Sequence, residues 1–416
     1  MRLVISNQHV LAAAALIATP VAVVAPQGMA PILAVVAVVL VVVKSRPTSY
    51  VLREARTLAV LLALTASWGA LSAVWSIIPG HSLFEAGRFA ILSVAGMVTV
   101  AAGAALPTAG RAIVGRAVIA GLCLGLLIIV VELRFDFPIH HALGGGADRV
   151  VPLTKLDRAA VVMSLFCWVA ILALTERGRG LAAGALFVVA AYALFHLASI
   201  SAILGLFVGA VVYALARWRP RQVAGLVIAS FVALSVALPL VPATRDTVTW
   251  LATSAPWLRA SALHRLVIWR FTSDRIAEHP LLGWGMDASR EIPGGKTDIR
   301  DYLGLSQGEV PSIAPGTSSA LPLHPHNAIL QWWVELGGAG AALGFAIWAW
   351  IVWRAATWHA GSYATPAAAL AAVSAAGPPL LLSFGIWQAW WQSTLWLTAA
   401  LLIAVALPQQ TSGTDA

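Results

Sequence analysis

Apolar stretches of about twenty residues recur along almost the whole of this 416-residue chain. Each stretch is long enough to cross the hydrocarbon core of a bilayer as a helix, since about twenty helical residues span about 30 Å. Sixty per cent of the residues are hydrophobic and only 10% are charged. The sequence therefore predicts an all-α integral membrane protein.

The hydrophobic pattern predicts about twelve transmembrane helices. They lie near residues 9–25, 28–43, 57–77, 88–105, 115–132, 158–175, 180–198, 200–216, 222–240, 326–352, 365–383 and 393–407. We expect residues 1–240 to hold the first nine helices, with a smaller outer loop at 133–157. Residues 241–325 are expected to form one large outer loop, 326–407 the last three helices and 408–416 a short tail.

Basic residues set the expected orientation. If the first segment is retained as a helix and not cleaved as a signal, twelve of them fall in short cytoplasmic connections, which is the bias seen in membrane proteins. They are Lys44, Arg46, Arg53, Arg56, Arg111, Arg116, Arg177, Arg179, Arg217, Arg219, Arg221 and Arg354. Both termini are then cytoplasmic. The net charge of +9 is mostly this topology signal and does not indicate a nucleic-acid partner.

Several signatures of other protein classes are missing from the sequence. Cys123 and Cys167 both fall in apolar helices, so we expect neither a disulfide framework nor a thiolate metal site. There is no phosphate-binding glycine loop, no nucleotide-binding fingerprint, no paired acidic motif at a membrane boundary and no zinc-ligand spacing. We therefore expect no cofactor and no metal, and a metal-bound nucleotide-sugar donor is disfavoured.

The large outer loop has three parts. Ser261–Glu278 lacks Gly and Pro and ends before Pro280, which predicts a helix lying against the membrane surface. His279–Gly285 reads as a turn. From Ile292 to Pro325 the chain is rich in Gly, Pro and Ser, which predicts an irregular flap.

His326 and Asn327 stand where this loop enters an apolar helix. An imidazole exchanges protons near neutral pH, so a histidine at a membrane boundary indicates proton-transfer chemistry. Asn327 is expected to cap the helix start beneath it. Gly337 and Gly340, with Gly344, are expected to let a neighbouring helix approach closely. His324 is a weaker candidate, and the plain alternative for His326 is a polar interface residue.

The outer face also carries a dense set of basic residues, and a guanidinium can grip phosphate oxygens with two parallel hydrogen bonds. The set comprises Arg149, Lys155, Arg158, Arg259, Arg265, Arg270 and Arg275. Trp269, one turn after Arg265, is expected to hold that guanidinium by a cation–π contact. The alternative for each arginine is an ion pair, for example Arg158 with Asp157 or Arg270 with Asp274. We expect two or more of them to converge on a phosphate.

This pattern resembles the O-antigen ligase and polymerase superfamily of bacterial envelope glycosyltransferases. The ligase signature is His, then Asn, Ser or Gln, nine free positions, Gly, two free positions, then Gly, Thr or Tyr. His326, Asn327, Gly337 and Gly340 match it completely. The segment from Arg265 through Trp269 to the turn at residues 280–285 is also similar to the outer loop of the family.

The resemblance implies a metal-independent, inverting glycosyltransferase of the GT-C type in the bacterial inner membrane, with its site on the periplasmic face. The implied donor is an O-polysaccharide on undecaprenyl pyrophosphate, and the implied acceptor is a sugar hydroxyl of lipid A core. In such an enzyme His326 is the base that activates the acceptor. Arg265, with Arg158 as the second arginine, binds the donor pyrophosphate.

Three other functions stay open from the sequence. An O-antigen polymerase shares the layout and the donor, and a protein-directed oligosaccharide transferase belongs to the same superfamily. A flippase or other transporter of lipid-linked sugars is a different class, and it favours charges and broken helices near the bilayer midplane. The polar groups of this chain crowd one outer boundary, which favours chemistry over transport.

Overall fold

The computed structural model describes residues 6–43, 49–144, 150–197, 199–240, 244–255, 257–258, 260–306, 309–310, 313, 316, 319–358 and 364–407. The predicted tail at 408–416 lies outside these residues, as do Arg149 and Arg259. The described part is mostly helical. In it, the β-type pairing consists of one isolated antiparallel bridge between Asp298 and Ser319. The predicted all-α class is confirmed.

Eight helical segments within the described residues are long and apolar enough to cross a bilayer. They are formed by α1 (Asn7–Val24), α3 (Ser49–Leu71) with η2 (Ser72–Val74), α4 (Pro79–Ala104), α5 (Thr108–Arg134), η3 (Leu153–Leu156) with α7 (Asp157–Thr175), α10 (Pro220–Ala237) with η4 (Leu238–Leu240), α14 (Ala328–Ala356), and α15 (Ala364–Ala375) with α16 (Gly377–Leu382). Four shorter apolar helices occupy the other predicted crossings, so the count of twelve stays a prediction. They are η1 (Pro26–Gly28) with α2 (Met29–Val42), α8 (Gly180–Phe195), α9 (Ile200–Ala216) and α17 (Ala389–Val405).

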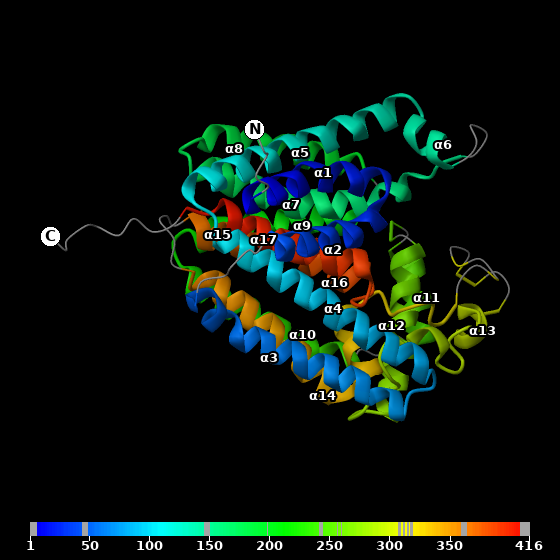
Figure 1. The fold of residues 1–416 in the computed structure, drawn as a ribbon. Coiled ribbons are helices and arrows are strands. Elements are labelled where there is room, and N and C mark those ends of the chain that lie inside the picture. Colours follow the sequence, from blue (N-terminus) through cyan, green and yellow to red (C-terminus); the bar gives the residue numbers. More distant parts are fainter. Residues whose placement is uncertain are drawn as a thin grey trace.

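Helix α7 forms the centre of the bundle. Every side chain from Ala159 to Leu174 is buried, and α1, α5, α8, α9, α15 and α17 all contact this helix. A helix that is apolar on all sides is stable only where it is surrounded by apolar neighbours. Helix α14 belongs to a second group, in which it packs against α3 and α10 (Figure 1).

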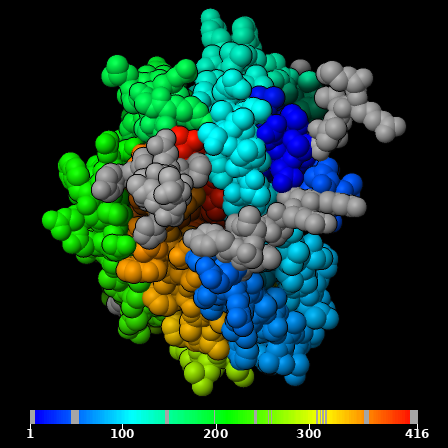
Figure 2. All heavy atoms as spheres, turned by 60° about the vertical axis from the view of Figure 1, so that its left-hand side comes forward, coloured from blue at the N-terminus to red at the C-terminus, as the bar shows by residue number. Residues whose placement is uncertain are grey.

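Short helices gather at one end of the bundle. Figure 1 shows α6 (Pro138–Gly144) there, together with the helices between α10 and α14. These are α11 (Arg245–Ser254), α12 (Ala260–Glu278), η5 (Ala288–Glu291) and α13 (Ile299–Leu303). Figure 2 shows the molecule from another side, with α3 in blue next to α14 in orange; the red of the last helix shows only in gaps between its neighbours.

Two parts of the predicted outer loop differ from expectation. Helix α12 forms where it was predicted, but Leu263, Val267 and Phe271 are buried and the helix packs against α14, so its apolar side is covered by protein. The predicted flap at 292–325 is folded in its described part. Arg300 holds it, since its guanidinium donates to the main-chain carbonyls of Ser306, Glu309 and Ile313. Glycine and proline content alone does not report such long-range anchoring.

Candidate active site

His326 lies just before α14 and has an unusual backbone. Its φ is +54°, a left-handed conformation that costs energy in a residue with a side chain. Its main-chain N–H donates to Nδ1 of His324 at 3.1 Å. Its own Nδ1 donates to the carbonyl of Ser383, at the end of α16, at 2.6 Å. The proton is therefore on Nδ1, and Nε2 carries the free lone pair that a base needs.

The surroundings keep this imidazole neutral. Burial lowers the pKa of His326, the hydrogen bond to Ser383 opposes that shift, and the charges of Arg265 and His264 lower the pKa further. The neutral form is the one able to accept a proton. Asn327 caps α14 as predicted, because its side-chain oxygen accepts a hydrogen bond from the main-chain N–H of Leu330 at 3.1 Å.

His324 supports His326 and is itself a poor base. The two rings lie 4.4 Å apart between centroids. His324 is 8% exposed, and burial, followed by the charges of His326 and Arg290, lowers its pKa to about 3. Because its Nδ1 already accepts from the backbone of His326, His324 helps to hold the left-handed conformation there.

Arg265 brings a poorly satisfied positive charge to the site. Its only hydrogen bond among the described residues goes from Nη1 to the carbonyl of Ser261, at 3.3 Å, and its buried Nε has no partner among them. Burial lowers the pKa of Arg265, and the charge of Asp157 opposes that shift. A half-buried guanidinium with open donors is suited to binding an anion.

Trp269 does not hold Arg265 as predicted. In the part of the chain that the structure describes, no cation–π contact joins these two side chains. The indole N–H of Trp269 instead donates to the carbonyl of Pro325 at 3.2 Å. Trp269 thus fixes the residue before His326, because packing of α12 against α14 turns its indole towards that backbone.

Arg158 is connected to His324 through contacts with Trp390 and Gln388. Its guanidinium carbon lies 5.5 Å from the ring centroid of Trp390, whose indole N–H donates to Oε1 of Gln388 at 2.8 Å. The amide nitrogen of Gln388 lies 3.2 Å from Nε2 of His324. The alternative ion pair between Arg158 and Asp157 is not formed among the described side chains, where Asp157 interacts with the charge of Arg265.

The remaining predicted cations are engaged elsewhere or exposed. Arg270 pairs with Asp274 at 3.1 Å, as the alternative reading proposed, and this carboxylate raises the pKa of Arg270. Arg275 pairs with Glu278 at 2.9 Å and lies over the ring of Phe271. Lys155 is exposed in η3. The structure places none of these three in contact with His326.

Gly337 breaks α14 and does not serve the predicted helix contact. Its φ of 63° and ψ of −168° are non-helical, and a Cβ added there would lie 2.2 Å from the carbonyl oxygen of Leu281. The turn at residues 280–285 crosses α14 at this break. Trp284 and Gly285 donate to the carbonyls of Val334 and Glu335, and Gly338 donates back to Pro280.

Gly340 and Gly344, by contrast, face side chains of their own helix. A Cβ at Gly340 would lie 2.1 Å from Cβ of Leu336, and one at Gly344 would lie 2.7 Å from the ring of Trp332. The glycines therefore make room for the turn at residues 280–285 and for large side chains of α14. Sequence spacing alone does not distinguish these contacts from a close helix pair.

Part of the chain is similar to a known protein family. Residues 185–345, which include Arg265, His326, Gly337 and Gly340, match the family model described as O-antigen ligase. This part of the chain is therefore similar to the O-antigen ligase family. Two relatives are a putative polysaccharide ligase of Rickettsia prowazekii (strain Madrid E), 28% identical over 298 residues, or 68% of this chain and 67% of the relative, and one of Rickettsia bellii (strain RML369-C), 28% identical over 349 residues, or 82% and 79%.

The structure also contains a buried carboxylate that sequence reasoning missed. Glu335 is fully buried, two residues before the break in α14. It accepts hydrogen bonds from the main chain of Asp287, the hydroxyl of Ser289, the indole of Trp387 and the amide of Gln331. A carboxylate in an apolar helix costs free energy unless its oxygens are hydrogen-bonded. A glutamate within the apolar sequence of α14 was therefore the signal that could have indicated this cluster.

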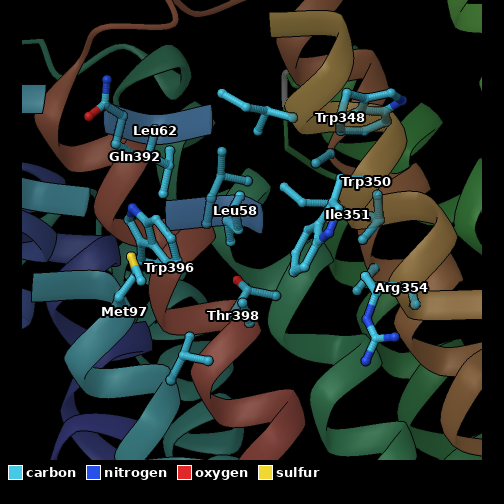
Figure 3. Close-up of a pocket in the computed structure, with 18 of the residues that line it drawn as sticks. Leu58, Leu62, Met97, Trp348, Trp350, Ile351, Arg354, Gln392, Trp396 and Thr398 are labelled. Carbon is cyan, nitrogen blue, oxygen red and sulfur yellow. The ribbon is translucent and has the colours of Figure 1, made fainter. Parts of the chain in front are cut away.

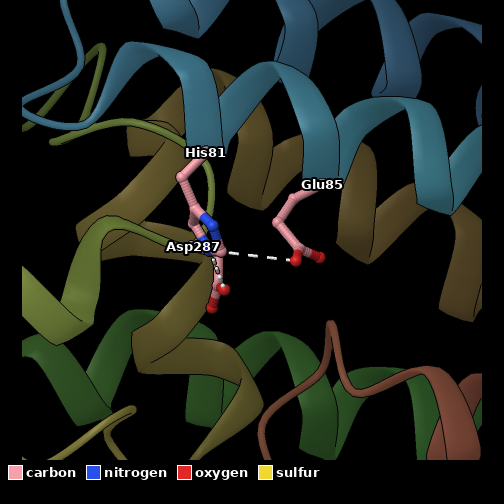
Figure 4. Close-up of side chains that lie close together, drawn as sticks. All are labelled: His81, Glu85 and Asp287. Carbon is pink, nitrogen blue, oxygen red and sulfur yellow. Dashed lines mark hydrogen bonds and ion pairs between the residues drawn. The ribbon is translucent and has the colours of Figure 1, made fainter.

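A second missed cluster lies beside it. Nε2 of His81 lies 2.8 Å from Oδ2 of Asp287 and 3.8 Å from Oε1 of Glu85, as Figure 4 shows. The three ligand atoms all lie within 4.8 Å of one another. Glu85 pairs with Arg88, and Asp287 with Arg290. No local motif predicts this cluster, because His81 and Asp287 are 206 positions apart.

A large apolar cavity of about 860 Å³ lies among the helices of the bundle. Side chains of α3, α4, α10, α14, α15 and α17 line it. In Figure 3, Trp350 and Ile351 face Met97 and Trp396 across the space. The lining includes Ala328, two residues after His326, and, near the other end of α14, Arg354. The cavity therefore extends along most of the length of this helix.

Proposed function

We propose that this protein is an O-antigen ligase. It transfers O-polysaccharide from undecaprenyl pyrophosphate to a sugar hydroxyl of lipid A core, at the periplasmic face of the inner membrane. The observation that carries the proposal is the orientation of His326, whose Nδ1 is held by Ser383 and whose Nε2 is left to act as a base. The family match to residues 185–345 supports the ligase type of chemistry.

The donor tail is assigned to the apolar cavity. An isoprenoid chain has no polar groups to satisfy, so it gains from burial along an apolar lining. The lining reaches Ala328 and Trp332 at the start of α14, so a lipid lying there presents its diphosphate close to His326. The same arrangement suits a lipid-linked donor better than a water-soluble nucleotide sugar.

The proposed reaction is a single inverting displacement without a metal, as in glycosyltransferases of the GT-C type. Nε2 of His326 takes the proton of the acceptor hydroxyl while the hydroxyl oxygen attacks the anomeric carbon. The bond between that carbon and the diphosphate oxygen breaks, and its electron pair stays on the diphosphate. Arg265 and Arg158 stabilise the charge that develops on this leaving group, and guanidinium groups can do so without a metal.

Lipid analysis of a deletion strain tests the assignment. Loss of a ligase leaves polymer on the undecaprenyl carrier and bare lipid A core. Loss of a polymerase leaves single repeats on the core, and loss of a flippase traps single repeats on the cytoplasmic side. Either of the last two results would refute the proposal, as would restoration of normal core decoration by a gene copy carrying His326→Ala.

A further inference from the structure

Arg88, on α4, lies at the end of the cavity nearest the site. The residue after it, Phe89, lines the cavity. Nη2 of Arg88 donates to the carbonyl of Trp387 at 2.8 Å, and the neighbouring Ile386 is also part of the lining. Arg88 is therefore fixed where the apolar lining gives way to polar groups.

Arg290, in η5, lies near the same place. Its guanidinium pairs with Asp287, and its charge acts on both Glu85 and His324. Since Glu85 is the partner of Arg88, the two arginines are joined through neighbouring carboxylates. Arg290 thus belongs to the carboxylate cluster and is close enough for its charge to act on His324.

Each of the two guanidinium groups pairs with a buried carboxylate, while the arginine side chain itself is partly exposed. The side chains of Glu85 and Asp287 are 3% and 7% exposed, whereas those of Arg88 and Arg290 are 32% and 35% exposed. In the described part of the chain, Nη1 of each arginine has no hydrogen-bond partner. Buried carboxylates that orient arginines in this way leave N–H donors free for an anion.

A metal ion fits this cluster less well than an anion does. His81, Glu85 and Asp287 have the spacing of a cation site, but each carboxylate is already paired with a guanidinium. A divalent cation added there would meet two positive charges at close range. The exposed side of the cluster offers hydrogen-bond donors, which a phosphate accepts.

We propose that Arg88 and Arg290 bind the phosphate that carries the isoprenoid tail of the donor. This inference rests on the proposed function. In it, each phosphate of the donor diphosphate is bound by its own pair of arginines. A tail in the cavity leaves its first phosphate at Arg88 and Arg290. The second phosphate, which carries the sugar, then reaches Arg265 and Arg158. The charge of Arg290 acts on His324 and that of Arg265 acts on His326, and the two histidine rings are 4.4 Å apart.

The test measures lipid binding and not turnover. Purified protein in nanodiscs is titrated with undecaprenyl diphosphate, undecaprenyl phosphate and undecaprenol, none of which carries a sugar. The Arg88→Gln, Arg290→Gln double variant is expected to lose about tenfold or more in affinity for both phosphorylated lipids, since charge-assisted hydrogen bonds are lost. Its affinity for undecaprenol should not change, because the cavity is untouched.

Matched variants complete the test. Lys296→Gln removes an exposed cation that pairs with the exposed Glu291, and this variant should bind all three lipids like the wild type. The Arg88→Lys, Arg290→Lys double variant keeps the charges but loses the forked donors. Its affinity for the phosphorylated lipids should therefore lie between those of the wild type and the Gln variant. If the Gln variant unfolds, the Lys variant still decides the question, and wild-type affinity for the phosphorylated lipids in it overturns the proposal.

Other results would also overturn the inference. Equal loss of undecaprenol binding would indicate a structural role, and loss of lipid binding on chelation with EDTA would indicate a cation site. Weakened binding of phosphorylated core oligosaccharide, with lipid binding intact, would assign the arginines to the acceptor. His326→Ala should bind the lipids normally, so a failure of the proposed transfer chemistry is recognised separately, by its activity.

Discussion

The imidazole of His326 is tied to the main-chain carbonyl of Ser383, 57 positions away, by a hydrogen bond of 2.6 Å. Because a carbonyl only accepts, this bond fixes one tautomer of the ring. It also connects the start of α14 to the end of α16, so the orientation of the base depends on how these two helices pack. The hydroxyl of Ser383 in turn donates to that of Ser201, in α9, at 2.8 Å.

His326→Ala should reduce turnover by about 10² to 10⁴, the usual contribution of a general base, with little change in thermal stability. The measurement is transfer of labelled polysaccharide from the lipid-linked donor to the acceptor by purified protein. His9→Ala, at an exposed position on α1, is the control and should keep full activity. Wild-type turnover by the His326 variant would contradict the role of this residue as the base.

The pH dependence of transfer should reflect the lowered pKa of His326. Its ordinary value is 6.5, and burial is the main cause of the shift. Activity needs the neutral ring, so it is lost only as pH falls through the folded-state pKa. The rate should therefore be flat from about pH 8 to 6.5 and should decline below that range.

Arg265→Gln should move the acid limb of this profile to higher pH, because the charge of Arg265 contributes to lowering the pKa of His326. The rates are compared at saturating donor, since the variant should also bind donor more weakly. Lys155→Gln is a control that should leave the limb in place. An unchanged acid limb in the Arg265 variant would show that this charge does not act on the base.

Gly337→Ala should destabilise the protein by about 1–3 kcal/mol or more. Its φ and ψ lie in a region that essentially only glycine adopts, and the new Cβ would collide with the carbonyl of Leu281. Gly184→Ala, in α8 with open space around it, should be neutral or slightly stabilising. Thermal unfolding in detergent measures both, and equal midpoints would argue against the break in α14.

Glu335→Ala should destabilise the protein by about 3 kcal/mol or more, because several buried donors lose their acceptor. Glu335→Gln should cost less, since its amide oxygen can still accept from Asp287 and Trp387. Glu278→Ala, which removes a half-exposed partner of Arg275, should have little effect. Hydrogen exchange of residues 285–291 should rise in the Glu335→Ala variant alone.

Local features of the site could be predicted. Asn327 caps α14 because a cap depends on residues three positions apart, and the histidine precedes the helix because the apolar run begins there. The Arg270 ion pair with Asp274 follows from i,i+4 spacing in the same way. The contact expected between Arg265 and Trp269 failed, although the spacing was right, because Trp269 found an acceptor at Pro325 in another segment.

The sequence by itself determined that the chain is a bundle of apolar helices and that a histidine with an asparagine cap begins one of them. Both depend on residues close together in the chain. The tertiary structure alone decided that Ser383 orients His326, that Gly337 admits a turn in place of a helix, and that Arg88 and Arg290 share one carboxylate cluster. Such contacts join distant segments, and they are decided by which helices pack together and by the need of buried charges for partners.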